Sequence, residues 1–379
     1  MPIPLPVSAP APLPLEGVRS DLLDCIQVNL AVLADHFHGP GTHLNLGAHL
    51  DLPLRALPDG LPTADPTLEA RLLTDAPLAG LRTAARRRLT AAELLAETAR
   101  HPEVHYVVAD SYHLPWLPYH GTAHMDHSFL LTAGPVGWHV TDAYRIETRW
   151  GAALPGEHVL GEAALSGIGP AQVLTFLPAP PQPVQPSVAD IDPEPYVHAY
   201  ATWPDRLRAL EQLSAETWLL TRARKLHAAY RAQRAGRSEP TEAERAHLTA
   251  WDKLVEQVYL AQRRVARGRA EPTGTTDRLA ALLAADRTVF TADPATTVAT
   301  DADDALRRAI AAMAADVLGV AQADLLDGAA LDSFPSFSSF RLVEIIDRIE
   351  SDLGLELDAD ELIPEKLRRV DDFCRIARR

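Results

Sequence analysis

Three residues of this 379-residue chain have the chemistry of covalent acyl transfer. Cys25 lies at the start of a stretch in which apolar residues recur at helical spacing. The dipole of such a helix lowers the pKa of a thiol at its N-terminus, which favours a nucleophilic thiolate. His127 could take the thiol proton as a base, and Asp142 could hold the imidazole in one tautomer. These residue types predict a cysteine nucleophile assisted by a His–Asp pair.

The elements expected around these residues would bring them together. Residues 24–38 have the periodicity of an amphipathic helix whose first turn carries the cysteine. Runs rich in β-branched and aromatic residues predict strands over 104–108, 128–132 and 138–146. His127 directly precedes the second run, Asp142 lies in the third, and a Gly-Pro turn separates the two runs. Antiparallel pairing of these strands would place the imidazole beside the carboxylate.

The spacing of three histidines allows a metal site as an alternative. His120, His124 and His127 would lie on one face of a helix and could together bind a zinc ion. Pro118 and Gly121 disfavour a helix there, and the residues that follow favour a strand. We therefore prefer the Cys–His–Asp site and predict no metal ligand.

The length of the chain and its prolines predict several domains, because 379 residues exceed the usual size of one domain. The proline-rich stretch 178–195 predicts a stiff extended linker, and a second break is expected over 288–302. The fold class expected is multidomain α+β. An α+β domain would cover 17–177, a small helical domain 196–287, and a four-helix bundle 303–379.

The C-terminal segment resembles an acyl or peptidyl carrier protein over its whole length. The motifs that carry this resemblance are Leu318-Gly319-Val320, Ser338-Ser339-Phe340, Leu342 to Glu350, and Leu353-Gly354-Leu355-Glu356-Leu357. The resemblance implies that a serine opening the second helix carries 4′-phosphopantetheine, and counting from both sides leads to Ser339. Ser333 is the second choice, since its use would require a six-residue insertion before that helix. A helix N-terminus also suits the phosphodiester that the modification leaves.

Residues 23–145 resemble the N-terminal domain of the butirosin-biosynthesis acyltransferase family, which has a papain-like cysteine-peptidase fold. The matching pieces are Asp24-Cys25, Asp110 to Trp116, His124 to Phe129, and Val140 to Asp142. Segment 196–285 is similar to the domain that often follows in this family. The resemblance implies acyl transfer with Cys25 as nucleophile, His127 as base and Asp142 as the residue that orients it.

Charge differs between the segments in a way that suits docking of a carrier. Residues 301–379 contain 18 Asp and Glu against 10 Lys and Arg, a net charge of −8, whereas residues 205–269 have a net charge of +6. The basic segment could therefore receive the acidic carrier. The candidate contact residues are Arg222, Arg224, Lys225, Arg263, Arg264 and Arg267.

Composition excludes several other classes. Hydrophobic residues make up 47% and charged residues 23%, so the chain can form a core. The net charge of −15 argues against binding to nucleic acid and to anionic membranes. Two cysteines are too few for a disulfide framework. Because the sequence has neither a long apolar run nor a basic leader, we expect a cytoplasmic protein.

Together these observations predict a bifunctional biosynthetic protein. An acyl or aminoacyl group on the phosphopantetheine of Ser339 would pass to Cys25 and then to a small amine acceptor. The partners implied are a phosphopantetheinyl transferase and a loading ligase. Two alternatives stay open: a thioesterase or amidase that uses water as acceptor, and a non-catalytic carrier scaffold whose N-terminal domain binds a partner.

Overall fold

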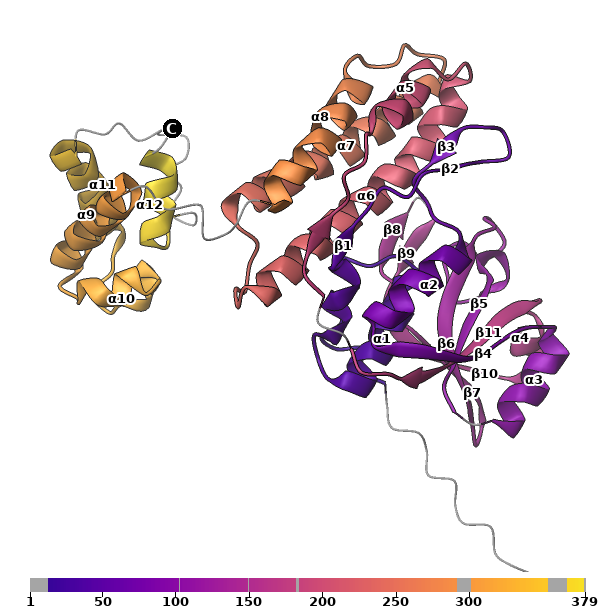
Figure 1. The fold of residues 1–379 in the computed structure, drawn as a ribbon. Coiled ribbons are helices and arrows are strands. Elements are labelled where there is room, and N and C mark those ends of the chain that lie inside the picture. Colours follow the sequence, from indigo (N-terminus) through magenta and orange to yellow (C-terminus); the bar gives the residue numbers. More distant parts are fainter. Residues whose placement is uncertain are drawn as a thin grey trace, which may run out of the picture. The chain divides into compact units, whose positions relative to one another are not determined.

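The computed structural model describes residues 13–101, 103–148, 150–181, 184–291, 301–353 and 367–377. The chain forms two compact units, Met1–Thr291 and Ala292–Arg379, which Figure 1 colours from indigo to orange and from orange to yellow. The predicted α+β and helical segments thus belong to one unit. Among the described residues, no helix is long and apolar enough to cross a membrane.

A six-stranded sheet forms the centre of the α+β segment. Its strands are ordered β10-β7-β6-β5-β11-β4, and every neighbouring pair is antiparallel. The strands are β4 (Leu81–Leu89), β5 (His105–Asp110), β6 (Asp126–Gly134), β7 (Gly137–Asp142), β10 (Gly156–Leu160) and β11 (Ala171–Pro178). The strands predicted over 104–108 and 128–132 are present as β5 and β6. The run predicted over 138–146 is divided, because β7 ends at Asp142 and a new strand begins at Ile146.

Short elements complete this segment. The helices are α1 (Gln27–His38), η1 (Thr42–Gly47), α2 (Leu68–Leu78), α3 (Ala91–Arg100), η2 (Ser111–His113) and α4 (Glu162–Ser166). Two-stranded pairs are formed by β1 (His49–Leu50) with β12 (Ser187–Val188), β2 (Arg55–Ala56) with β3 (Pro62–Thr63), and β8 (Ile146–Thr148) with β9 (Gly151–Ala153). Helix α1 is buried from Val28 to Asp35 and so lies within the core.

The helix predicted from Asp24 begins later than expected. The Oδ1 atom of Asp24 accepts hydrogen bonds from the backbone N–H groups of Ile26 and Gln27, at 2.8 and 3.0 Å. These bonds close a turn over residues 24–27, and α1 starts at Gln27. Cys25 therefore lies in the turn before the helix rather than in its first turn, because a short carboxylate side chain competes for the first backbone donors.

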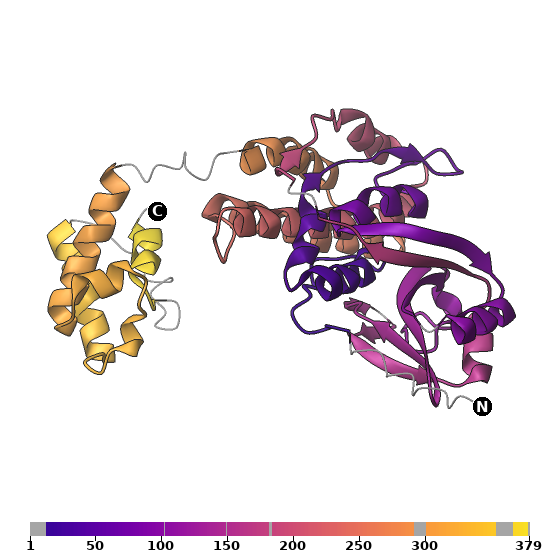
Figure 2. The same ribbon diagram turned by 60° about the horizontal axis from the view of Figure 1, so that its bottom comes forward.

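The helical segment packs directly on the α+β segment. It contains α5 (Glu194–Thr202), α6 (Arg206–Arg234), α7 (Glu242–Val265) and α8 (Thr275–Thr291), and Figure 2 shows these helices on one side of the unit and the large sheet on the other. At Gly47 the backbone of η1 meets α6 so closely that an added Cβ would lie 2.5 Å from the carbonyl oxygen of Leu226. The His227 imidazole also hydrogen-bonds the Gly47 carbonyl at 2.7 Å.

A buried carboxylate joins the two segments further along α6. Glu216 accepts hydrogen bonds from the hydroxyl groups of Tyr196 and Tyr200, from the amide of Gln212 and from the backbone N–H of Ala64. Four donors compensate the loss of hydration that burial of this charge causes.

The predicted linker 178–195 is not a free spacer. Within it, β12 pairs with β1 in parallel, and α5 begins at Glu194. The second predicted break begins later than expected, since α8 continues to Thr291. Residues 292–300 of that break lie outside the described residues.

The second unit is helical. It contains α9 (Asp301–Leu318), α10 (Gln322–Leu326), η3 (Leu331–Ser333), α11 (Ser339–Leu353) and α12 (Val370–Ala377), and apolar residues of all the α-helices share one core. The helical character predicted for 303–379 is present in its described residues. Of the carrier-like motifs, Gly354 to Leu357 lie outside the described residues.

Candidate active site

Strands β6 and β7 bring His127 and Asp142 together. His127 is the second residue of β6 and Asp142 is the last residue of β7. The imidazole Nε2 lies 2.8 Å from the carboxylate Oδ2, and both side chains are buried. A carboxylate at this distance holds the imidazole in the tautomer with its proton on Nε2.

Asp142 accepts hydrogen bonds from three further groups. The Trp116 indole Nε1–H donates to Oδ2 at 2.9 Å, and Oδ1 accepts from the Tyr144 backbone N–H at 3.0 Å and the Asn29 amide at 3.4 Å. Burial alone would raise the pKa of this carboxyl, but His127 and the hydrogen-bond donors outweigh burial and lower it. Asp142 is therefore ionised at neutral pH.

Hydrogen bonds on both sides of His127 fix the turn that carries Cys25. The Cys25 thiol donates to the backbone carbonyl of Asp126 at 3.4 Å, and the Ser128 hydroxyl donates to the Cys25 carbonyl at 2.5 Å. Asp126 and Ser128 flank His127 along β6. These two hydrogen bonds therefore hold the Cys25 turn against the part of the strand that carries the base.

The two ring nitrogens of His127 differ in their partners. Nε2 is bonded to Asp142, whereas the buried Nδ1 makes no hydrogen bond with any residue that the structure describes. With the Nε2 proton directed at the carboxylate, Nδ1 carries the lone pair and can accept a proton. Transfer of the Cys25 proton to this atom requires the thiol to leave its hydrogen bond with the Asp126 carbonyl.

The surroundings of Cys25 disfavour the thiolate that the sequence predicted. Burial raises the pKa of Cys25, and the adjacent Asp24 carboxylate raises it further, while Arg71 opposes them. Arg71 pairs with Asp24 and, at 2.7 Å, with Asp65. Cys25 is therefore a thiol in this structure, and a base must remove its proton for it to react.

The three histidines of the alternative metal site are separated. His127 bonds to Asp142, whereas the His124 Nδ1 lies 2.6 Å from Asp110 and its ring stacks on Tyr112. Among the described residues, no group of three or more His, Cys, Asp or Glu side chains is arranged to hold a metal ion.

Three residues around the pair were not predicted to take part. Asn29, Trp116 and Tyr144 all contact Asp142, and the Tyr144 ring also meets the His127 ring edge-on, with centroids 5.1 Å apart. Asn29 follows Cys25 by four residues, so its place near the cysteine could have been inferred from helical spacing. Trp116 and Tyr144 come from separate loops. Trp116 ends the Asp110 to Trp116 motif of the family resemblance, but that motif gave it no role, and no local pattern marks Tyr144.

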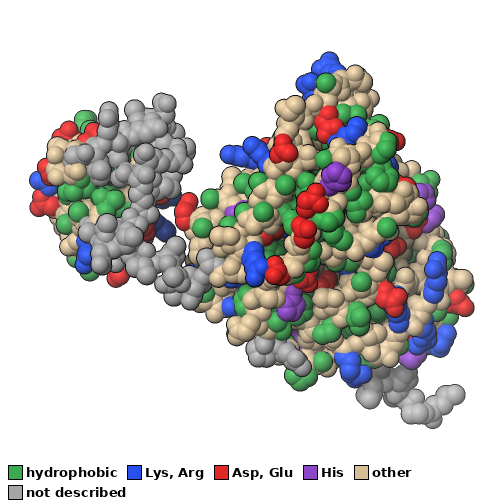
Figure 3. All heavy atoms as spheres, turned by 45° about the horizontal axis from the view of Figure 1, so that its top comes forward, with side chains coloured by type: hydrophobic (Ala, Val, Ile, Leu, Met, Phe, Trp, Pro, Cys, Tyr) green, Lys and Arg blue, Asp and Glu red, His purple; other side chains and the backbone are tan. Residues whose placement is uncertain are grey.

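The prediction of a basic docking surface on the helical segment is partly wrong. Arg224 is buried and pairs with Asp286, Arg222 donates to the carbonyls of Ser20, Leu23 and Arg145, and Lys225 pairs with Asp252. Arg267 is exposed, and Arg263 and Arg264 are partly exposed. On the face of the first unit in Figure 3, Lys and Arg side chains are dispersed among Asp and Glu.

In the second unit the structure separates the two candidate serines. Ser339 is the first residue of α11, and the Ser338 hydroxyl accepts a hydrogen bond from the Arg341 backbone N–H at 3.3 Å, as a helix cap does. Ser333 lies in η3, and its hydroxyl donates to the Ala330 carbonyl at 2.5 Å. Phe340, next to Ser339, is 89% exposed.

Comparison with protein-family models and with curated proteins gives no match at a significant level. The functional interpretation therefore rests on the site itself.

Proposed function

We propose that this protein is a cysteine-dependent acyltransferase fused to a carrier domain. It would move an acyl or aminoacyl group from a phosphopantetheine thioester to Cys25 and then to a small amine. The observation that carries the proposal is the His127 ring, which lies in the strand that binds the Cys25 turn. Its Nε2 is bonded to an ionised Asp142, and its buried Nδ1 has no hydrogen-bond partner in the described part of the chain. This arrangement suits a base that takes a thiol proton.

The first half-reaction would form an acyl-enzyme. The Cys25 thiol loses its proton to His127 Nδ1, and Sγ attacks the thioester carbonyl, so that a carbon–sulfur bond forms on the enzyme. The carrier's carbon–sulfur bond breaks, and His127 returns the proton to the departing thiolate. Asp142 stabilises the imidazolium that exists between these two proton transfers.

In the second half-reaction an amine would take the place of the leaving thiol. Its nitrogen attacks the acyl carbonyl on Cys25, His127 Nδ1 removes a proton from the nitrogen, and the Cys25 thiolate leaves and is reprotonated. The product is an amide. The same residues would hydrolyse the acyl-enzyme if water attacked instead, and this defines the thioesterase outcome of the test below.

The residues at the start of α11 fit a phosphopantetheine attachment site. Ser339 begins a 15-residue helix, where the helix dipole favours a phosphodiester. The neighbouring residues Ser338 and Phe340 are exposed, so a modifying enzyme has access to this surface. The group would supply the flexible thiol that holds the acyl chain as a thioester, and a phosphopantetheinyl transferase and a loading ligase are the partners that this role requires.

Intact-protein mass spectrometry tests both parts. With coenzyme A and a broad phosphopantetheinyl transferase, the wild type and Ser333→Ala should gain one phosphopantetheine and Ser339→Ala should gain none. With an acyl-pantetheine thioester, the wild type and Cys374→Ala should form an acyl-enzyme and Cys25→Ala should not. The proposal fails if Cys25→Ala is acylated at the same rate as the wild type.

The acceptor is identified by what releases the acyl group. Release that depends on added amine, with an amide as product, supports the transferase, whereas equal release in water alone identifies a thioesterase. Mixing Cys25→Ala chains loaded at Ser339 with Ser339→Ala chains shows whether transfer occurs between chains. A wild-type protein that is loaded but never acylated at Cys25 would leave only the carrier scaffold.

A further inference from the structure

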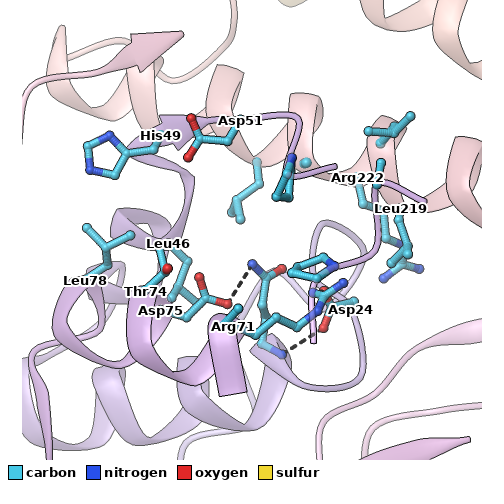
Figure 4. Close-up of a pocket in the computed structure, with 18 residues that line it drawn as sticks. Asp24, Leu46, His49, Asp51, Arg71, Thr74, Asp75, Leu78, Leu219 and Arg222 are labelled. Carbon is cyan, nitrogen blue, oxygen red and sulfur yellow. Dashed lines mark hydrogen bonds and ion pairs between the residues drawn. The ribbon is translucent and has the colours of Figure 1, made fainter. Parts of the chain in front are cut away.

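A cavity of about 200 Å³ lies between α1, α2 and α6 in the first unit. Asp24 and Gln27, which flank Cys25 in the chain, line it, but Cys25 does not. Figure 4 shows Asp75, Arg71 and Asp24 together on one wall, with Leu219 and Arg222 of α6 on another. The volume is below the roughly 300–1,000 Å³ of sites for drug-sized ligands, so a ligand here would be small.

Asp75 is a buried acidic residue of the cavity lining. Its carboxyl is 7% exposed, and among the described residues the Gln27 amide is the only side chain that hydrogen-bonds it, at 3.2 Å. No described cation lies within ion-pair distance of it, because Arg71 is bound to Asp24 and Asp65. A buried carboxyl that has one neutral donor and borders an open cavity lacks a counter-ion.

The other charges of the cavity favour a cation over an anion. Asp51 adds a second carboxylate at the rim. Arg222 is the remaining cation of the lining, and it donates to the backbone carbonyls of Ser20, Leu23 and Arg145. The cationic groups are therefore occupied, whereas Asp75 and Asp51 have room for a positively charged partner.

The cavity wall formed by α6 is largely apolar, so the part of the ligand that lies against it should be apolar too. Side chains of α6 that line the cavity there are Leu219, Leu220, Ala223 and Leu226. Such a wall packs against methylene groups. A metal ion does not fit these surroundings, since no group of three or more potential ligands exists among the described residues.

We propose that this cavity binds a small primary alkylamine whose ammonium group pairs with Asp75. The alkyl part would lie against the α6 wall, and a second amino group would reach Asp51. The inference is independent of the proposed function, because Cys25 and His127 do not line the cavity.

The affinity should depend on pH in a defined direction. Burial raises the pKa of Asp75 to about 7, Asp24 raises it as well, and Arg71 and Gln27 oppose them. His49, Asp51 and Arg222 are the other titratable groups of the lining. An ammonium ligand requires ionised Asp75, so binding should tighten by about tenfold per pH unit below this pKa and level off above it.

Calorimetric titration of the full-length protein with 1,4-diaminobutane tests the proposal. We expect saturable binding to the wild type and to Cys25→Ala, and at least tenfold weaker binding to Asp75→Asn. Glu69→Gln is the matched control, since Glu69 is an exposed acid on the same helix outside the cavity; it should bind like the wild type.

A second variant guards against a folding defect in Asp75→Asn. Ala223→Leu places a larger side chain on the α6 wall and leaves every charge in place, so it should also abolish binding. The uncharged 1,4-butanediol and the anionic succinate should not bind. The proposal is overturned if the diamine does not bind, if it binds Asp75→Asn as tightly as the wild type, or if the diol binds equally well.

Discussion

Asp142 and Asp75 are both buried in the first unit, yet their pKa values shift in opposite directions. Asp142, 3% exposed, is hydrogen-bonded to His127 and to three further donors, and its pKa is lowered. Asp75, 7% exposed, is hydrogen-bonded by one side chain of the described residues, the Gln27 amide, and its pKa rises to about 7. Depth of burial is similar, so the number and charge of the partners decide whether a carboxyl is ionised. The Asp142 carboxylate therefore has its partners within the protein, whereas the Asp75 carboxyl lacks a counter-ion among the described residues.

The largest effect is expected from Asp142→Asn. The amide cannot stabilise the imidazolium and favours the wrong tautomer of His127, so acyl-enzyme formation should slow by about 10³–10⁴-fold. Single-turnover mass spectrometry of Cys25 acylation measures this rate. A loss of less than tenfold, with the fold intact by circular dichroism, would show that Asp142 does not support the base.

Asp75→Asn should change the pH dependence of stability. The raised pKa of Asp75 stabilises the folded state at low pH, and this contribution is lost as pH rises from about 4 to about 7, by up to about 4 kcal/mol. The variant should therefore gain stability relative to the wild type across this range. Urea unfolding of both proteins at several pH values measures the difference, and a difference independent of pH would mean that Asp75 is ionised throughout.

Gly47→Ala should affect the cavity more than the catalytic pair. Its Cβ would lie 2.5 Å from the Leu226 carbonyl oxygen, so α6 must move away from η1. We expect a loss of about 1–3 kcal/mol in unfolding free energy. Gly161→Ala is the control, because its added Cβ has no atom within 4 Å and its φ of −77° suits alanine. Equal stability of the two variants would contradict the close approach seen here.

A smaller effect is expected from Asn29→Ala. The Asn29 amide donates weakly to Asp142 at 3.4 Å, but it also donates to the Ser128 carbonyl at 2.8 Å and accepts from the Ala143 N–H. Loss of the Asn29 amide should loosen the packing of β6 against α1 and reduce the rate of Cys25 acylation by about tenfold. Asn29→Asp should not restore the rate, because it cannot donate to Ser128. An unchanged rate in Asn29→Ala would show that the other donors are sufficient.

Local pattern predicted the strands and helices that carry the pair. Runs rich in β-branched and aromatic residues, with a Gly-Pro turn between them, placed β6 beside β7. His127 and Asp142 lie close to the strand ends, as expected. A helical bundle was also expected for the C-terminal segment, and its described residues are helical. In each case the signal lies within about ten residues, which is the range over which such patterns operate.

The parts that sequence could not predict depend on distant partners. Arg224 looked like a surface cation, but Asp286 pairs with it from a helix 62 residues away. Asp24 delayed the start of α1 through its own side chain and raised the pKa of Cys25. The burial of Asp75 results from the packing of α2 against β4, α1 and η1, and no local pattern contains that information.

The pH dependence of Cys25 alkylation tests the central claim most directly. In a Cys374→Ala background, the rate of reaction with iodoacetamide reports thiolate formation at Cys25 with and without its base. We predict that the wild type reacts at a lower pH than His127→Ala, with Asp142→Asn between the two, because His127 Nδ1 accepts the thiol proton. Identical profiles for the wild type and His127→Ala would contradict the account, since Cys25 would then ionise without help from the buried histidine.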